Sequence, residues 1–187
     1  MAYADTLPND VTDHVASEIG MMAGPVLGET IRAEQTLELT ESFAVWTLGA
    51  DAVTKPSMDL SQLARQTGRW HHQIKIDGKP EAFARSMPLG PKAADWSVRQ
   101  LFTSRIAKRL DEAIDWVDRN VQGDPLVRLL LVPPWHLHTF WLVEDRESRI
   151  LVVDIPLSYT KLQYRKLYTS KEVLETLAQE QRIITVL

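Results

Sequence analysis

The chain has 187 residues, of which 44% are hydrophobic and 25% charged, a composition typical of a globular protein rather than a disordered or fibrous one. It contains no cysteine, which excludes disulfides, thiolate metal sites and cysteine nucleophiles. Its net charge of −4 disfavours a general nucleic-acid or anionic-membrane binder, because both functions need a positive field.

Neither a targeting signal nor a membrane segment is expected. Residues 1–13 lack the basic and apolar regions of a secretory signal, and no apolar run approaches the roughly 20 residues of a spanning helix. We therefore expect a cytoplasmic protein of bacterial type. Since no repeat, low-complexity tract or linker divides the chain, a single α+β domain over residues 1–187 is expected.

The N-terminal part of the chain predicts helical and extended segments in turn. Residues 10–22 carry apolar side chains at helical spacing, and the Ala-Gly-Pro run at 23–25 is expected to end that helix. Residues 1–40 are a candidate for a partly mobile helical arm. The β-branched and aromatic side chains of residues 42–48 favour a strand, and residues 57–68 predict a short capped helix.

The clearest hairpin is predicted over residues 70–88. Asp77 and Gly78 supply the two positive-φ positions of a tight primed turn. Side chains alternate along a strand, so His71 and His72 are expected to point to opposite faces. At most one of the two is then expected in the core.

The C-terminal half predicts one long helix and then several strands. Residues 93–121 give the strongest helical pattern, with apolar residues every three or four positions. Three β-like segments follow, over residues 126–132, 136–144 and 149–155, and their short links require antiparallel neighbours. A last helix is expected to begin with Ser170 as its cap.

These elements together predict an α+β fold. Its centre is an antiparallel sheet of five or six strands. One long helix, residues 93–121, is expected to pack on a face of this sheet, and smaller helices are expected at the N- and C-terminal ends.

Residues 60–76 also carry a second pattern. Residues 63–68 (Leu-Ala-Arg-Gln-Thr-Gly), followed by Ile74, resemble the first helix and turn of helix-turn-helix proteins, in which an alanine stands four residues before the turn glycine. The resemblance implies a DNA-associated regulator that acts through this element. The acidic net charge and the competing strand pattern favour the hairpin instead, so no nucleic-acid contact is predicted.

Four of the five histidines lie in two short strand-like segments. His136 and His138 are two residues apart on an expected strand, which places both imidazoles on one face. With His72, or its neighbour His71, and a carboxylate such as Asp154, they are candidate ligands of a divalent transition metal in a metal-dependent enzyme. The simpler interpretation is that these histidines fill half-buried sheet positions, and no cofactor is expected.

Tryptophans at the ends of elements often line pockets, and Trp70 and Trp135 both occupy such positions. If the two Trp-His segments meet, they form one cleft together with an arginine from the neighbouring hairpin arm. The expected ligand-binding cleft consists of Trp70, His72, Arg85, Trp135, His136 and His138.

Other signals of chemistry are weak. Residues 161–168, with Lys171 beyond them, interleave basic and aromatic side chains, a mixture found at phosphate-binding surfaces and in solvated loops. Neither a nucleophile elbow nor a phosphate-cradling glycine loop occurs in the sequence. We assign no catalytic residue and expect a non-catalytic binding or assembly module, whose partner is another protein or a second copy of the chain. The alternatives are the metal-dependent enzyme and the DNA-associated regulator.

Overall fold

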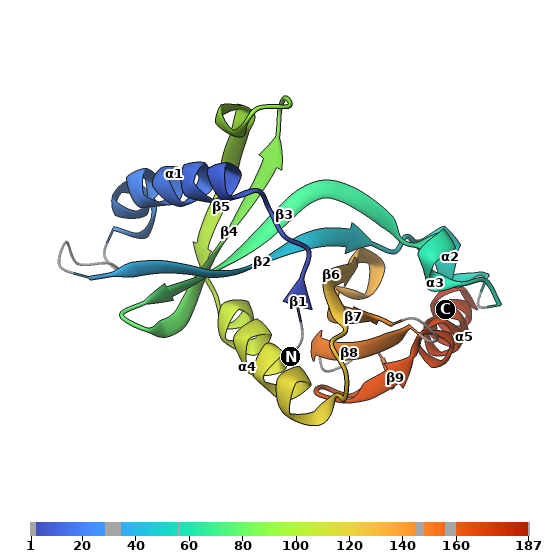
Figure 1. Cartoon of the computed structure of the whole chain (residues 1–187). Helices are drawn as coiled ribbons and strands as arrows, with labels where there is room; N and C mark the ends of the chain where they lie inside the picture. The colour runs from blue at the N-terminus through green and yellow to red at the C-terminus, as the bar shows by residue number, and fades with distance from the viewer. Residues whose placement is uncertain (1–2, 29–34, 56, 145–147, 156–159, 187) are drawn as a thin grey trace. The chain divides into compact units, whose positions relative to one another are not determined.

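The computed structural model describes residues 3–28, 35–55, 57–144, 148–155 and 160–186 (Figure 1). The chain forms two compact units. The hairpin unit comprises residues 4–44 and 68–116, and the meander unit comprises residues 1–3, 45–67 and 117–187. The mixed α and β character is confirmed, but the described residues contain nine strands rather than the expected five or six. The expectation of one domain over residues 1–187 stays a prediction.

The hairpin unit contains most of the N-terminal half of the chain. Its elements are α1 (Asn9–Leu27), β2 (Leu37–Thr47), β3 (Arg65–Ile76), β4 (Lys79–Pro88), a 3-10 turn (Ala93–Asp95), β5 (Trp96–Thr103) and the greater part of α4 (Arg105–Asn120). The strands are hydrogen-bonded in the order β5-β4-β3-β2. The last residues of β2 and the first residues of β3 belong to the meander unit.

The tight turn between β3 and β4 is confirmed. Asp77 and Gly78 have φ angles of 49° and 75°, as a primed turn requires. The Asp77 carboxylate also accepts hydrogen bonds from the Thr36 backbone N–H at 3.0 Å and from the Gln35 side chain at 2.8 Å. These bonds lower the pKa of Asp77, and they fix the chain just before β2.

Pairing along this hairpin is interrupted by one extra residue. Ile76 pairs with Lys79 and Lys75 with Pro80, but Ile74 pairs with Ala82, so Glu81 is a bulge. The bulge shifts the register of every pair beyond it by one residue, and side chains of β4 therefore change faces relative to β3.

Helices cover both faces of the hairpin unit's strands. α1 packs its buried residues against one face, in a cluster that includes Ile74, Ala84 and Val98. On the other face, the Gln73 amide donates to the carbonyl of Ala107 in α4 at 2.7 Å. The expectation that only one histidine of the adjacent pair is buried is therefore wrong. His71 is 1% exposed and His72 is 0% exposed, although adjacent side chains of a strand point to opposite faces.

The prediction of one long helix over residues 93–121 is also wrong for the first part of this range. Residues Trp96–Thr103 form strand β5, and the helix α4 begins only at Arg105. Ser86 pairs with Val98 and Arg85 with Gln100, so Arg99 is a bulge. The bulge spaces the buried residues Val98 and Leu101 three apart, which imitates the period of a helix.

The N-terminal helix is longer than expected. It continues through Pro25 to Leu27 and ends at Gly28, although the Ala-Gly-Pro run was expected to stop it. Its buried residues, from Val11 to Leu27, all belong to the cluster on the hairpin unit's strands. Residues 29–34, where part of the expected mobile arm falls, lie outside the described residues.

The meander unit confirms the three consecutive antiparallel strands. Its elements are β1 (Tyr3–Ala4), α2 (Ala50–Val53), α3 (Leu60–Leu63), β6 (Leu126–Val132), a 3-10 turn (Pro133–Trp135), β7 (Leu137–Val143), β8 (Arg149–Asp154), β9 (Leu167–Thr169) and α5 (Ser170–Val186). β6, β7, β8 and β9 pair antiparallel in this order, while the end of β2 pairs parallel with β6. The short α2 and α3 and the first turns of α5 cover the same apolar cluster as these strands.

The helix-turn-helix interpretation of residues 60–76 is wrong. α3 ends at Leu63, and the residues that a second helix would need form strand β3 from Arg65 onward. Residues 70–76 form a strand instead of a helix, because the Asp77–Gly78 turn brings β4 alongside them as a pairing partner.

Two tryptophans pack against each other in the meander unit, one buried and one partly buried. Trp46 and Trp141 meet edge to face with their ring centroids 5.4 Å apart. The guanidinium of Arg128 lies over both rings, 4.5 Å from the centroid of Trp46 and 5.1 Å from that of Trp141. Arg128 is thus held by two cation–π contacts.

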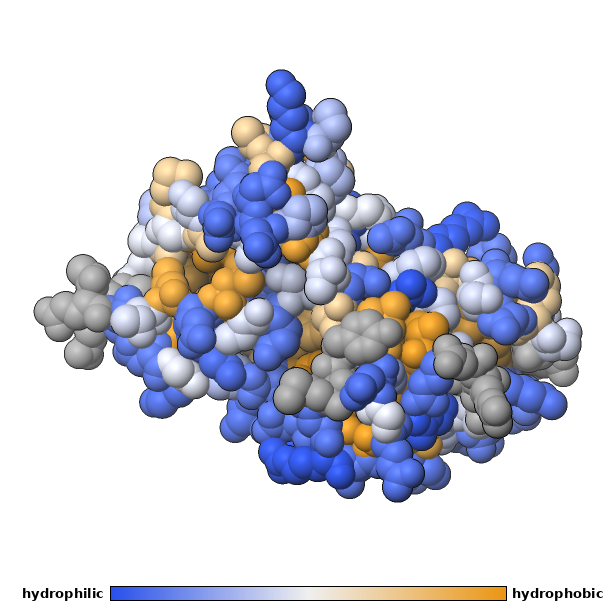
Figure 2. All heavy atoms as spheres, in the orientation of Figure 1, coloured by the Kyte–Doolittle hydropathy of each residue, from blue (hydrophilic) through white to orange (hydrophobic). Residues whose placement is uncertain are grey.

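Hydrophilic residues cover most of the face drawn in Figure 2 and separate its hydrophobic patches. Among the helices of the described chain, none combines the length and the apolar character that crossing a bilayer requires.

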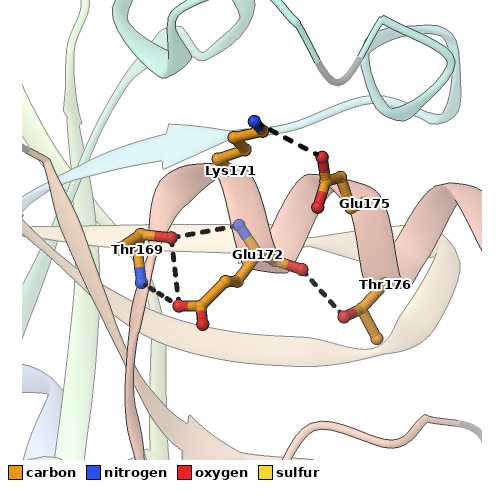
Figure 3. A network of polar contacts seen from close by, with 5 residues as sticks. All are labelled: Thr169, Lys171, Glu172, Glu175 and Thr176. Carbon is orange, nitrogen blue, oxygen red and sulfur yellow. Dashed lines mark hydrogen bonds and ion pairs between the residues drawn. The ribbon is translucent and has the colours of Figure 1, made fainter.

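The start of α5 has a different cap from the one expected. The N-cap of the helix is Thr169 and not Ser170. The Thr169 hydroxyl accepts a hydrogen bond from the Glu172 N–H at 3.2 Å, and the Glu172 carboxylate accepts one from the Thr169 N–H at 2.8 Å (Figure 3). This reciprocal pair is a capping box, and its hydrogen bonds lower the pKa of Glu172.

We expect Thr169→Ala to lower the free energy of unfolding by about 1 kcal/mol, because the substitution removes the cap. Ser170→Ala, one residue further on, is the matched control and should change stability by less than half as much. Chemical denaturation of both variants measures the difference. Equal losses in the two variants would contradict the assignment of the cap to Thr169.

Candidate anion-binding site

Three arginines line one pocket of the hairpin unit. The pocket has a volume of about 120 Å³ and is lined by Arg69 of β3, by Arg85, Ser86 and Met87 of β4, and by Arg99 and Gln100 of β5. Three adjacent strands therefore each contribute a cation to a small hollow in a chain whose net charge is −4.

The two bulges bring these side chains together. His71 pairs with Arg85 and Gln100, which places these three positions on one face of the strands. Arg69 and Met87 lie two residues further along their strands and so share that face. The bulge at Arg99 allows two consecutive residues of β5 to line the same pocket, whereas a regular strand would send them to opposite faces.

Arg85 carries an uncompensated charge. Burial, and then the charge of Arg69, lower the pKa of its guanidinium from the ordinary value. Within the described residues, neither Arg85 nor Arg99 has an ion pair with a carboxylate, and the buried Nε of Arg85 has no hydrogen-bond partner. Its guanidinium carbon lies 5.5 Å from the ring centroid of Phe83, which is its one described stabilising contact.

A polar chain lies on the opposite face. The imidazole of His72 bridges two hydroxyl groups: Nδ1 is 2.9 Å from Ser42 Oγ, and Nε2 is 2.7 Å from Ser86 Oγ. Burial lowers the pKa of His72 to about 4. The ring is therefore neutral at pH 7, with one nitrogen donating and the other accepting. Ser86 directs its hydroxyl to this bridge and away from the arginine side.

The residues predicted for the cleft fall into two groups. Trp70 pairs with Ser86 and shares its face with His72, while Arg85 lies on the other face. A regular hairpin counted from the turn would have paired Trp70 with Arg85, and the bulge at Glu81 separates them. Trp135, His136 and His138 belong to the meander unit.

Within the meander unit, His136 and His138 do not share a strand face. Pro133 and Pro134 begin a 3-10 turn, and His136 ends it in the left-handed conformation with φ of 49° and ψ of 31°. β7 starts only at Leu137, so His136 is outside the strand and exposed, whereas His138 pairs with Asp154 of β8. Trp135 is a core residue of this unit.

Across the residues that the structure describes, no group of three His, Asp or Glu side chains is placed to hold a metal ion. The set His72, His136 and His138 is divided between the two units.

A second hollow is present in the meander unit, but the one cation of its lining already has a carboxylate partner. It is more open and has a volume of about 530 Å³. It is lined by Ser57, Met58, Asp59, Ser170, Lys171 and Glu175. Lys171 lies 3.8 Å from Glu175 in an ion pair, so this cation is already compensated (Figure 3). The basic and aromatic residues at 164–168 contact one another, with Arg165 over Tyr164 and Lys166 over Tyr168.

Sequence reasoning found Arg85 but missed Arg69, Met87, Arg99 and Gln100. The helix-turn-helix resemblance of residues 60–76 places Arg69 in a helical turn, and the long helix predicted over residues 93–121 includes Arg99. In the sequence, Arg69 stands two residues before His71 and Arg85 two residues before Met87, so each arginine shares a strand face with that neighbour. Predicting that these arginines meet also requires the pairing register of β3, β4 and β5, which the two bulges determine.

Comparisons of this chain with protein-family models, with curated proteins and with solved structures find no match. The geometry of the arginine pocket is therefore what indicates a function.

Stability is expected to fall in acid because of His72. Its folded pKa is about 4 and its ordinary value 6.5, so below pH 6.5 the unfolded chain binds a proton that the folded chain does not. The free energy of unfolding should decrease by about 3 kcal/mol as the pH falls from 6.5 to 4.

His72→Gln keeps groups that bond to both serines but cannot be protonated. Denaturation at pH 7 and at pH 4.5 should show a smaller loss for this variant than for the wild-type chain. The same loss in both proteins would show that His72 does not control the acid response.

Proposed function

We propose that the chain is a non-catalytic binding module whose ligand is a small anionic group of the phosphate class, held by Arg69, Arg85 and Arg99. One observation carries this proposal: a half-buried arginine without an ion pair among the described residues lies beside a second arginine. Gathering like charges costs stability, and a bound anion offsets that cost.

The chemistry of the guanidinium supports the same ligand class. Its planar fork of N–H groups matches the oxygens of phosphate or sulfate, and charge-assisted hydrogen bonds of this kind are stronger than neutral ones. The acidic net charge does not oppose binding at this range, because charges beyond about 10 Å are screened at 0.1 M salt. The unbonded Nε of Arg85 is a donor that such a ligand can satisfy.

The size of the pocket favours a compact group over a protein surface. A hollow of about 120 Å³ holds one small polyatomic anion rather than a folded partner. A protein partner or self-association through some other surface stays a prediction.

We expect isothermal titration calorimetry at about 0.1 M salt to detect binding of inorganic phosphate to the full chain. Arg85→Gln and Arg99→Gln should each weaken binding about tenfold or more, because each removes charged hydrogen bonds worth about 1.5–3 kcal/mol. Arg65→Gln is the matched control, since this side chain is 81% exposed and outside the pocket, 3.9 Å from Asp51. No phosphate binding by the wild-type chain, or equal weakening by all three variants, would refute the proposal.

The proposal also predicts how arginine substitutions affect stability. Arg85→Met should leave the melting temperature unchanged or raise it, because the substitution removes a half-buried cation that Arg69 repels. Arg128→Met should lower it, because Arg128 loses two cation–π contacts worth about 1 kcal/mol or more together. Thermal unfolding without added anions compares the two. A clear loss of stability in Arg85→Met would mean that Arg85 serves the fold.

A further inference from the structure

We infer that the anion bound in the arginine pocket is the phosphate of a nucleotide, whose base stacks on Phe102. This inference rests on the proposed anion site and adds the class of its ligand. It is carried by the position of an exposed aromatic ring beside the pocket.

Phe102 is 46% exposed, although it is a large apolar side chain on a strand. It pairs with Phe83, and Gln100 pairs with Arg85 on the same face, so Phe102 is two residues along β5 from the lining of the pocket. At about 3.4 Å per residue, this separation is roughly 7 Å. The sugar of a nucleotide separates its base from its phosphate by a comparable length.

A row of rings supports Phe102 from within the sheet face. The ring of Phe83 lies 5.6 Å from Phe102 and stacks on His71 at 4.7 Å with an interplanar angle of 21°. Phe83 also contacts the guanidinium of Arg85. One buried ring thus touches both the cation of the pocket and the exposed aromatic residue, and holds the two at a fixed spacing.

The chemistry of this arrangement selects a ligand with two parts. Arginines bind the phosphate oxygens, while an exposed phenylalanine offers a flat face on which a base stacks. Gln100 lies on the same face, in the lining of the pocket and two residues before Phe102. Its amide can donate a hydrogen bond to, and accept one from, a sugar hydroxyl or a base edge. A bare phosphate would use only the first part of the site.

The test compares three probes on the full chain by calorimetry at about 0.1 M salt: adenosine 5′-monophosphate, ribose 5-phosphate and inorganic phosphate. We expect the nucleotide to bind roughly five- to a hundredfold more tightly than ribose 5-phosphate, since stacking of a base on an aromatic side chain is worth about 1–3 kcal/mol. Phe102→Ala should reduce the nucleotide's affinity to that of ribose 5-phosphate and leave the other two affinities unchanged.

Two further substitutions separate stacking from apolar contact. Phe102→Tyr keeps the aromatic face and should retain the preference for the nucleotide, whereas Phe102→Leu keeps apolar area alone and should lose it. Equal affinities of the wild-type chain for the nucleotide and ribose 5-phosphate would overturn this inference and leave the anion site standing. Binding of none of the three probes would overturn the anion site itself.

Discussion

The register of the β3–β4 hairpin is the constraint on which the site depends. The extra residue Glu81 shifts pairing by one position, and a shift of one position moves each side chain of β4 to the other face relative to β3. With the bulge, Arg85 shares a face with Arg69 and the aromatic row. Without it, Arg85 would lie with Trp70 on the face that α1 covers. A single inserted residue therefore decides whether the arginines meet.

The two faces of these strands are used differently. One is closed by α1 and contains the neutral His72 bridge between two serines, in which each ring nitrogen has a partner. The other is covered by α4 near Gln73 and Lys75, where Lys75 forms an ion pair with Asp111 at 3.3 Å. Towards Arg69 and Arg99 this face is exposed. Burial thus keeps His72 neutral on one side, while on the other side Arg85 has no carboxylate partner among the described residues.

Local signals were enough to predict part of this structure. The Asp77–Gly78 turn, the three strands from Leu126 to Asp154 and the amphipathic N-terminal helix follow from turn chemistry and periodicity, which act over a few residues. The strand β5 did not follow, because the bulge at Arg99 spaces Val98 and Leu101 as a helix would. The site was beyond prediction for the same reason: bulges are set by tertiary packing, and the faces of the strands depend on them.

The two compact units are interleaved along the chain. β2 and β3 each pass from one unit to the other, and the meander unit is assembled from three separate segments. Neither unit is consequently a contiguous stretch of the gene that a single truncation could release or a recombination event could transplant. Residues 45–67 of the meander unit separate the two parts of the hairpin unit's sequence. An insertion or deletion among them must therefore keep the ends of β2 and β3 in place.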